Sequence, residues 1–292
     1  MESNEEKEVT DNNIPDPILT KVSSFPSMPR AAMKLRELLA KDDVSMDEIE
    51  KILRQDPGLA TNVLRLANSA FFGVPRKVET LKHAVTLLGI KRFAQIAVSA
   101  SMSKTIDKAV EGYDLSPGDL WLHSIAVSNT AEAFAKYKKL PAANDVFTPA
   151  LLHDMGKLVL GPFVNEERQK IERIMSTGQP LEVAEQMILG TDHAEIGALI
   201  LDRWSFPDDI VNAVRWHHEP ERNQNSTTKS DMTYLSNLIC QPQGDSGSAG
   251  GRSTGPAAAV LGRLGLKLDQ YVKFEEKTQS WMIKLSETLT FD

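Results

Sequence analysis

The feature that most limits the fold of this chain is a series of helix start signals, each followed by apolar residues at helical spacing. Ser45 and Glu48 form a capping box, in which each side chain satisfies a free backbone N–H group of the other residue. Asp56 before Pro57, and Thr80 before an apolar run, are N-cap signals of the same kind. Alternating runs of β-branched residues are scarce, so the pattern predicts an all-α fold.

The apolar spacing also suggests how the chain is organised. We expect a disordered tail over 1–20, two packed helical lobes over 21–112 and 113–240, a flexible loop over 241–256 and a helical extension over 257–292. Helices are expected over about 29–39, 45–53, 56–72, 80–89, 90–102, 116–134, 148–154, 165–176, 180–190, 192–204, 207–217, 229–240 and 268–288.

Composition narrows the functional classes. The chain has 33 Lys and Arg against 40 Asp and Glu, a net charge of −7, which gives no global attraction for nucleic acid. The single cysteine, Cys240, excludes an internal disulfide and suits a reducing compartment. No apolar stretch reaches the ~18 residues of a membrane span, and the acidic N-terminus is the opposite of a signal peptide. We therefore expect a cytoplasmic protein that binds neither membrane nor nucleic acid.

Five of the six histidines lie within residues 113–240, on or beside expected helices: His123, His153, His193, His217 and His218. Histidine is the commonest metal ligand, and imidazoles from several helices can converge on a metal ion in a bundle core. Asp154, directly after His153, adds a carboxylate, and such a donor set suits iron, manganese, zinc, nickel or cobalt. His83 stands alone in the first lobe and is expected to be structural.

The order of these residues resembles the HD superfamily of metal-dependent phosphohydrolases, and the later histidines are spaced similarly to its HD-GYP branch. Four segments resemble the related HDOD family of bacterial signalling proteins: DPGLATNVLRLANSAFFG at 56–73, TLKHAVTLLGI at 80–90, DLWLHS at 119–124 and LLHDMGK at 151–157. FPSMP at 25–29 is similar to the LPxLP opening of that family. The resemblance covers about residues 20–240 and implies a multi-helix HDOD bundle with a retained HD-type metal site.

The likeness to HD enzymes implies two ions, with His193, His217, His218 and Asp154 around the first and His123, His153, Asp154 and Asn237 around the second. Asn237 stands where these enzymes have an aspartate, and a neutral amide oxygen is a weaker donor to a hard cation. The implied cofactor is one or two transition-metal ions, iron or manganese first and zinc or nickel as alternatives. Lys157 matches a lysine that contacts phosphate in these enzymes.

Two functions follow from the resemblance. The first is a signal-transduction domain that keeps the metal site and acts by binding a signalling protein in trans. Asn237 favours it, as does the absence of Gly-Tyr-Pro after His218, since HD-GYP enzymes that cleave cyclic di-GMP carry that motif. The alternative, favoured by the retained ligands, is a metal-dependent phosphohydrolase acting on a nucleotide or phosphate ester. The sequence leaves turnover, the partner and the metal open.

Overall fold

A computed structural model of the chain describes residues 14–39, 41, 44–69, 77–140, 145–223, 227–241 and 256–288. Every named element within these residues is helical, and their one β-type pairing is an isolated bridge between Val110 and Leu115. The predicted all-α fold is therefore confirmed. None of the described helices is both long enough and apolar enough to cross a membrane. The loop expected over 241–256 lies outside the described residues except for its two ends.

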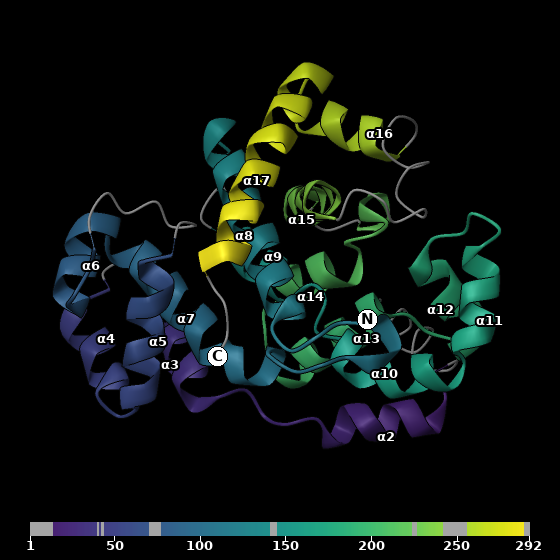
Figure 1. Ribbon diagram of the computed structural model, residues 1–292, viewed down its shortest axis with the longest axis horizontal. Coiled ribbons are helices and arrows are strands. Elements are labelled where there is room, and N and C mark those ends of the chain that lie inside the picture. Colours follow the sequence, from purple (N-terminus) through teal and green to yellow (C-terminus); the bar gives the residue numbers. More distant parts are fainter. Residues whose placement is uncertain are drawn as a thin grey trace, which may run out of the picture. The chain divides into compact units, whose positions relative to one another are not determined.

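The chain divides into two units, one of residues 1–26 and 109–273 and one of residues 27–108 and 274–292. The first unit holds α2 (Asp16–Ser24), η1 (Glu111–Tyr113), α8 (Asp119–Tyr137), α9 (Phe147–Leu152), α10 (Lys157–Glu166), α11 (Arg168–Met175), α12 (Leu181–Leu189), α13 (His193–Arg203), α14 (Asp208–Arg215), η2 (Pro220–Arg222), α15 (Thr227–Cys240) and α16 (Pro256–Arg263) (Figure 1). The second holds α3 (Arg30–Leu39), α4 (Met46–Leu53), α5 (Pro57–Ala67), α6 (Leu81–Leu88) and α7 (Ile90–Ile106). Helix α17 (Leu268–Thr288) begins in the first unit and ends in the second.

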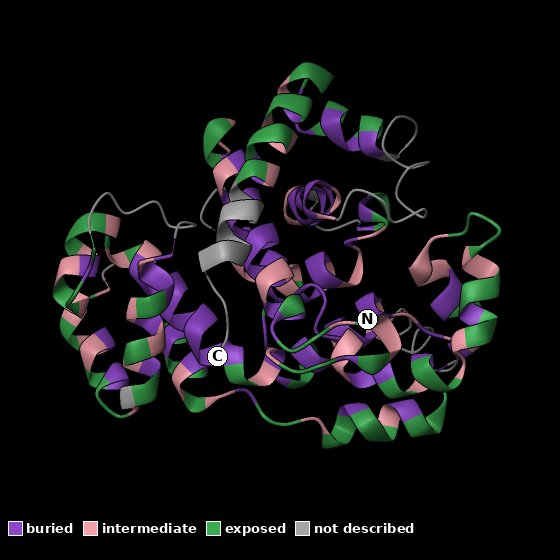
Figure 2. Ribbon diagram, in the orientation of Figure 1, coloured by how far each residue is buried: buried purple, intermediate pink, exposed green. Residues whose placement is uncertain are grey.

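The predicted start signals of the second unit are confirmed as caps. The backbone N–H of Glu48 donates to the Ser45 hydroxyl, and the Glu48 carboxylate accepts from the Ser45 N–H at 3.2 Å. The Asp56 side chain accepts a hydrogen bond from the backbone N–H of Leu59, three residues later, at 2.9 Å. Thr80 caps α6 in the same way. Each cap satisfies a donor that the first helical turn leaves free. Helices α3, α5 and α6 all pack against α7, which is buried along most of its length (Figure 2).

The expectation of a disordered tail over 1–20 is wrong for its last residues, because α2 begins at Asp16. Pro15 and Pro17 occupy the start of this helix, where a missing N–H costs no hydrogen bond. Ile18 and Val22, one helical turn apart, are buried, and α2 packs against α10 and α13. Two apolar residues make too short a pattern to predict a helix, which is stabilised here by tertiary packing. Residues 1–13 lie outside the described part of the chain.

The segment expected as one helix over 165–176 contains the end of α10 and all of α11. Helix α10 was not predicted as a separate element because Gly161 and Pro162 lie inside it, and both are unfavourable in helix interiors. Gly161 is nevertheless required by packing, because a Cβ atom built on it would lie 2.7 Å from Val110 Cγ1. A Cβ atom built on Gly112 of η1 would lie 2.2 Å from the Gly161 carbonyl oxygen, so these two backbones are in direct contact.

In the first unit, α8 packs against α9 and α15, and α13 packs against α14 (Figure 1). The facing sides carry the core, including Trp121, Ile125 and Phe134 of α8 and Leu235 of α15. Figure 2 shows most of α15 in purple, the colour of buried residues. These helices are the ones that carry or adjoin the histidines singled out in the sequence.

Candidate metal centre

Five separate segments of the first unit supply the candidate ligands. His123 lies near the start of α8, His153 and Asp154 directly follow α9, His193 is the first residue of α13, His217 and His218 follow α14, and Asn237 lies in α15. The turn after α9 and the start of α13 are fixed locally: Asp192 caps α13 by accepting from the Glu195 N–H at 2.8 Å. The helix ends therefore place side chains distant in sequence in one buried cluster.

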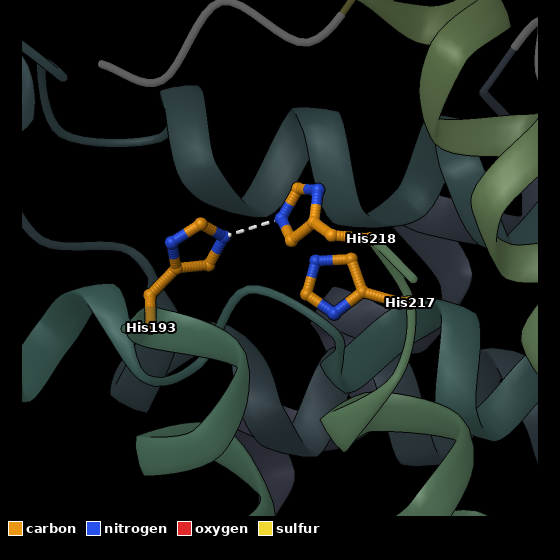
Figure 3. A group of neighbouring side chains, drawn as sticks. All are labelled: His193, His217 and His218. Atoms are coloured by element: carbon orange, nitrogen blue, oxygen red, sulfur yellow. Dashed lines mark hydrogen bonds between the residues drawn. The ribbon is translucent and has the colours of Figure 1, made fainter. Parts of the chain in front are cut away.

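The side chains gather in two groups. His193, His217 and His218 form one, shown in Figure 3, and His123, His153 and Asp154 form the other. Within each group the candidate ligand atoms all lie within 4.8 Å of one another, which is close enough to surround one ion. Asn237 adjoins the second group, with its Oδ1 atom 3.0 Å from His123 Nε2. The structure thus brings together every residue that the sequence singled out as a ligand.

Asp154 lies between the two groups and faces both. Its Oδ2 atom is 3.4 Å from His153 Nε2 and 3.6 Å from His123 Nε2. Its Oδ1 atom is 3.3 Å from His193 Nε2 and 3.9 Å from His217 Nε2. Four imidazole nitrogens therefore surround a single buried carboxylate, which is the central group of the site.

The outward bonds of two rings fix which nitrogen carries the proton. His153 Nδ1 lies 2.8 Å from the Ala150 carbonyl oxygen, and His217 Nδ1 lies 2.6 Å from the Val214 carbonyl oxygen. A carbonyl can only accept, so each Nδ1–H donates and Nε2 is the ring nitrogen that faces the cluster. These Nε2 atoms and Asp154 Oδ1 are buried without a hydrogen-bond partner among the described residues.

Burial and neighbouring charges hold these groups in the ionisation states of metal ligands. Burial alone would raise the pKa of Asp154, but His153 and Lys157 beside it hold the pKa well below its usual range. Burial, together with the neighbouring His153, lowers the pKa of His217 well below its usual value. Burial also lowers the pKa of His123 to about 3. At neutral pH the carboxylate is therefore ionised and these imidazoles are neutral.

His193 has a different environment because it contacts a second buried carboxylate, Glu185 of α12. One oxygen of Glu185 accepts from both His193 Nδ1, at 2.7 Å, and the His193 backbone N–H, at 2.8 Å. The other accepts from the Tyr113 hydroxyl at 2.7 Å. Burial alone would lower the pKa of His193, but Glu185 outweighs burial and raises it to about 10. A protonated His193 donates from Nε2 to His218 Nε2, 2.8 Å away (Figure 3).

Sequence reasoning missed Glu185 and Tyr113. Glu185 is fully buried, and it follows Ala184 on the apolar side of α12. A carboxylate on the buried face of an amphipathic helix is the signal that could have identified it, since such a group needs a partner. Nothing local marks Tyr113, because its partner Glu185 is 72 residues away in the sequence.

Glu185→Gln is expected to weaken metal binding about 10- to 100-fold while leaving the fold intact. The carboxylate orients the His193 ring and increases the basicity of its Nε2 atom, and outer partners of this kind have effects of that size. Competition with a coloured chelator would measure the affinity. Glu37→Gln, an exposed change on α3, is the matched control and should leave the affinity unchanged. Equal affinities in the two variants would show that Glu185 does not act through His193.

Lys157 and two arginines near the histidines have carboxylate partners in the structure. Lys157 Nζ donates to Asp154 Oδ2 at 2.7 Å and lies 5.6 Å from the centre of the Tyr113 ring. Arg215 donates to Glu195 at 2.8 Å, and Arg222 donates to Glu219 at 2.8 Å. Lys157 is thus the cation closest to the cluster, and it balances part of the Asp154 charge.

The donor set fits a metal ion on physical grounds. Lone pairs of His153 Nε2, His217 Nε2 and Asp154 Oδ1 converge without hydrogen bonds, and burying such unsatisfied groups is costly. Divalent cations in the two groups would satisfy these atoms, because imidazole nitrogen and ionised carboxylate are ordinary ligands of transition metals. The outward bonds from Nδ1 to carbonyl and carboxylate oxygens are those that orient histidine ligands in metal sites.

Comparison with known proteins gives a family and a fold. The family model of the HDOD domain matches residues 25–220. An uncharacterised protein of Treponema pallidum is 26% identical over 203 residues, which is 69% of this chain but only 39% of that protein. The chain thus spans well under half the length of this curated relative.

Two solved structures share the fold. An HDOD domain protein with unknown function from Geobacter sulfurreducens is 22% identical, with a TM-score of 0.75 over 94% of this chain and 98% of that one. A protein of Shewanella amazonensis described as a "Putative phosphohydrolase" is 24% identical, with a TM-score of 0.72 over 94% of this chain and 98% of that one. At these identities the likeness establishes the fold alone.

Proposed function

Because the chain belongs to the HDOD domain family, we propose that it is a signal-transduction domain that holds transition metal and acts by binding a protein partner in trans. The proposed ligands are His193, His217, His218 and Asp154 for one ion and His123, His153, Asp154 and Asn237 for a second. Iron or manganese is the metal we propose first. Such an ion, when bound, supplies Lewis acidity and lowers the pKa of a bound water.

The single observation that carries the metal assignment is the set of converging lone pairs around Asp154. Two Nε2 atoms and a carboxylate oxygen inside the same cluster have no hydrogen-bond partner among the described residues, and metal cations would satisfy them. The alternative source of positive charge in the cluster is a proton on His193, which forms the hydrogen bond to His218. A metal ion would replace this proton, so loading should release protons into solution.

Two features support a regulatory role over rapid turnover. The central ligands are buried, with His153, Asp154, His193 and His217 at most 1% exposed, and the most accessible ligand side chain, His123, is 22% exposed. Asn237 offers the second group an amide oxygen in place of a carboxylate, and it hydrogen-bonds His123. The second ion would therefore be held by one charged ligand only, which weakens a two-metal hydrolytic site.

The alternative function is a metal-dependent phosphohydrolase acting on a nucleotide or phosphate ester. The specific observation in its favour is Lys157, whose ammonium group lies 2.7 Å from Asp154 with its side chain 17% exposed. A cation at the rim of a metal site is placed to bind a phosphate oxygen. The "Putative phosphohydrolase" of Shewanella amazonensis with the same fold agrees with this alternative.

Asn237→Asp separates the two functions. The aspartate would give the second group a charged ligand, so a second ion should bind about tenfold more tightly or better. For a regulatory domain we expect that gain in metal affinity with hydrolysis of a nitrophenyl phosphate ester remaining at background. Metal analysis by mass spectrometry and a spectrophotometric assay with iron, manganese, zinc or nickel restored would measure both.

The matched control is Asn165→Asp, the same change at an exposed residue of α10 outside the cluster, checked for folding by circular dichroism. Measurable hydrolysis by the unaltered chain that rises in Asn237→Asp and is lost in Lys157→Ala would overturn the regulatory proposal and establish the hydrolase. Purified protein without bound metal, which also fails to take up added iron or manganese, would refute both.

A further inference from the structure

The second unit contains a cavity of about 360 Å³ between α3, α5 and α7, unrelated to the histidine cluster. Both α3 and α5 pack against α7, and residues at the starts of α3 and α5 and in the last turns of α7 line the cavity. Pockets that bind small molecules begin at about 300 Å³. The cavity is therefore large enough for a small organic ligand.

Part of the cavity lining is apolar, and we call this part the floor. It is formed by Ile52, Leu59 and Ala100, which are 8%, 3% and 3% exposed. Each belongs to a different helix, α4, α5 and α7 respectively, so the floor is built by the tertiary fold. A flat apolar group, such as an aromatic ring, is the kind of chemistry that such a floor accommodates.

The rim of the same cavity is cationic. Arg30, Lys34 and Lys104 line it, against the single carboxylate of Asp56. That carboxylate accepts the capping hydrogen bond of Leu59 and keeps its negative charge. Lys34 hydrogen-bonds the neutral Gln55 at 3.3 Å, and neither Arg30 nor Lys104 has an ion pair with any described residue. Three cations therefore outnumber the one carboxylate among the described residues that line the cavity.

Two helix starts add positive potential at the same place. Pro29, Arg30 and Ala31 at the start of α3 line the cavity, as do Gln55 and Asp56 at the start of α5. The first N–H groups of a helix lack internal partners and favour an anion. In α5 the Asp56 carboxylate already caps these groups, whereas the first turn of α3 carries no acidic residue.

We propose that this cavity binds a nucleoside monophosphate. The phosphate would contact Arg30, Lys34 and Lys104 through charge-assisted hydrogen bonds. The base would lie on the floor of Ile52, Leu59 and Ala100. The proposal does not rest on the metal centre, which is built from residues of the other unit.

The test is calorimetric titration of the full chain with AMP and GMP, and with adenosine and inorganic phosphate as the two halves of the ligand. We expect AMP or GMP to bind at least about tenfold more tightly than either half. A variant with Lys34→Glu and Lys104→Glu together should lose at least about tenfold of that affinity, since two attractive charges become repulsive. Lys82→Glu, an exposed change on α6 away from the cavity, should leave it unchanged.

Each other outcome would contradict the proposal. No heat of binding with either nucleotide at about 1 mM would overturn it. Equal affinity for inorganic phosphate and AMP would show an anion site without a base pocket. Nucleotide affinity that survives the double charge reversal would place the binding elsewhere, for instance at the metal centre. Circular dichroism and metal content, which should match the unaltered chain in all variants, separate these outcomes from misfolding.

Discussion

Asp154→Ala is expected to remove about nine-tenths or more of the metal that the purified chain carries, the largest loss of any single substitution. Asp154 is the only carboxylate that faces both groups of described ligands, with Oδ1 toward His193 and His217 and Oδ2 toward His123 and His153. Removing it takes the one charged ligand from each group, and loss of one ligand exceeds the 10- to 100-fold cost of losing an outer partner. Mass spectrometry of metals would measure the loss.

His153→Ala and His83→Ala make that experiment specific. His153 contributes to one group, so its substitution should remove most of the metal but less than Asp154→Ala does. His83 lies on α6 of the other unit, so the His83→Ala chain should keep its full metal content. Full retention in His153→Ala and Asp154→Ala, with native circular dichroism, would show that the cluster is structural and holds no metal.

Gly156→Ala is expected to destabilise the first unit by at least about 3 kcal/mol and to lower metal content with it. A Cβ atom at this position would lie 1.9 Å from the His193 carbonyl oxygen and 2.7 Å from the Gly197 backbone nitrogen. Both atoms belong to the backbone of α13, which cannot rotate away as a side chain would. To relieve this steric clash, α13 must move away from the turn at His153 and Asp154. That movement separates His193 from Asp154.

Gly262→Ala is the matched control, since a Cβ atom there meets nothing within 4 Å. Gly262 lies inside α16, where alanine is favoured over glycine by about 1 kcal/mol, so this variant should be neutral or slightly more stable. Urea unfolding followed by circular dichroism would give both free energies. Equal free energies of unfolding for the Gly156→Ala and Gly262→Ala chains would contradict this prediction. They would mean that α13 moves away from the new Cβ atom at no cost in free energy.

The fold was predictable where the signal is local. Ser45, Asp56 and Thr80 cap helices as expected because a cap needs only the next three residues of the chain. Helix α2 was missed because its stability comes from burying Ile18 and Val22 against helices distant in the sequence. Such packing leaves little trace in a short segment, which is why the expected tail was too long.

The same distinction between local and tertiary signals applies to the candidate metal centre. The histidines and Asp154 were recognisable because few residue types bind metal, and the structure brings them together. The bond of Glu185 to His193 and the contact of Gly156 with α13 were not recognisable, since each depends on where α13 lies. Chemical identity can be read from a sequence, whereas an outer hydrogen bond or a backbone contact requires the tertiary arrangement.

The sharing of Asp154 between two groups has a thermodynamic consequence for the proposed metals. Two cations on opposite oxygens of one carboxylate would compete for its charge, so occupancy of one position lowers the affinity of the other. Linkage makes this penalty reciprocal, and coupling energies between sites are typically about 1–3 kcal/mol. Filling would then spread over a wide range of metal concentration as negative cooperativity, and the half-loaded chain would be the dominant species across that range.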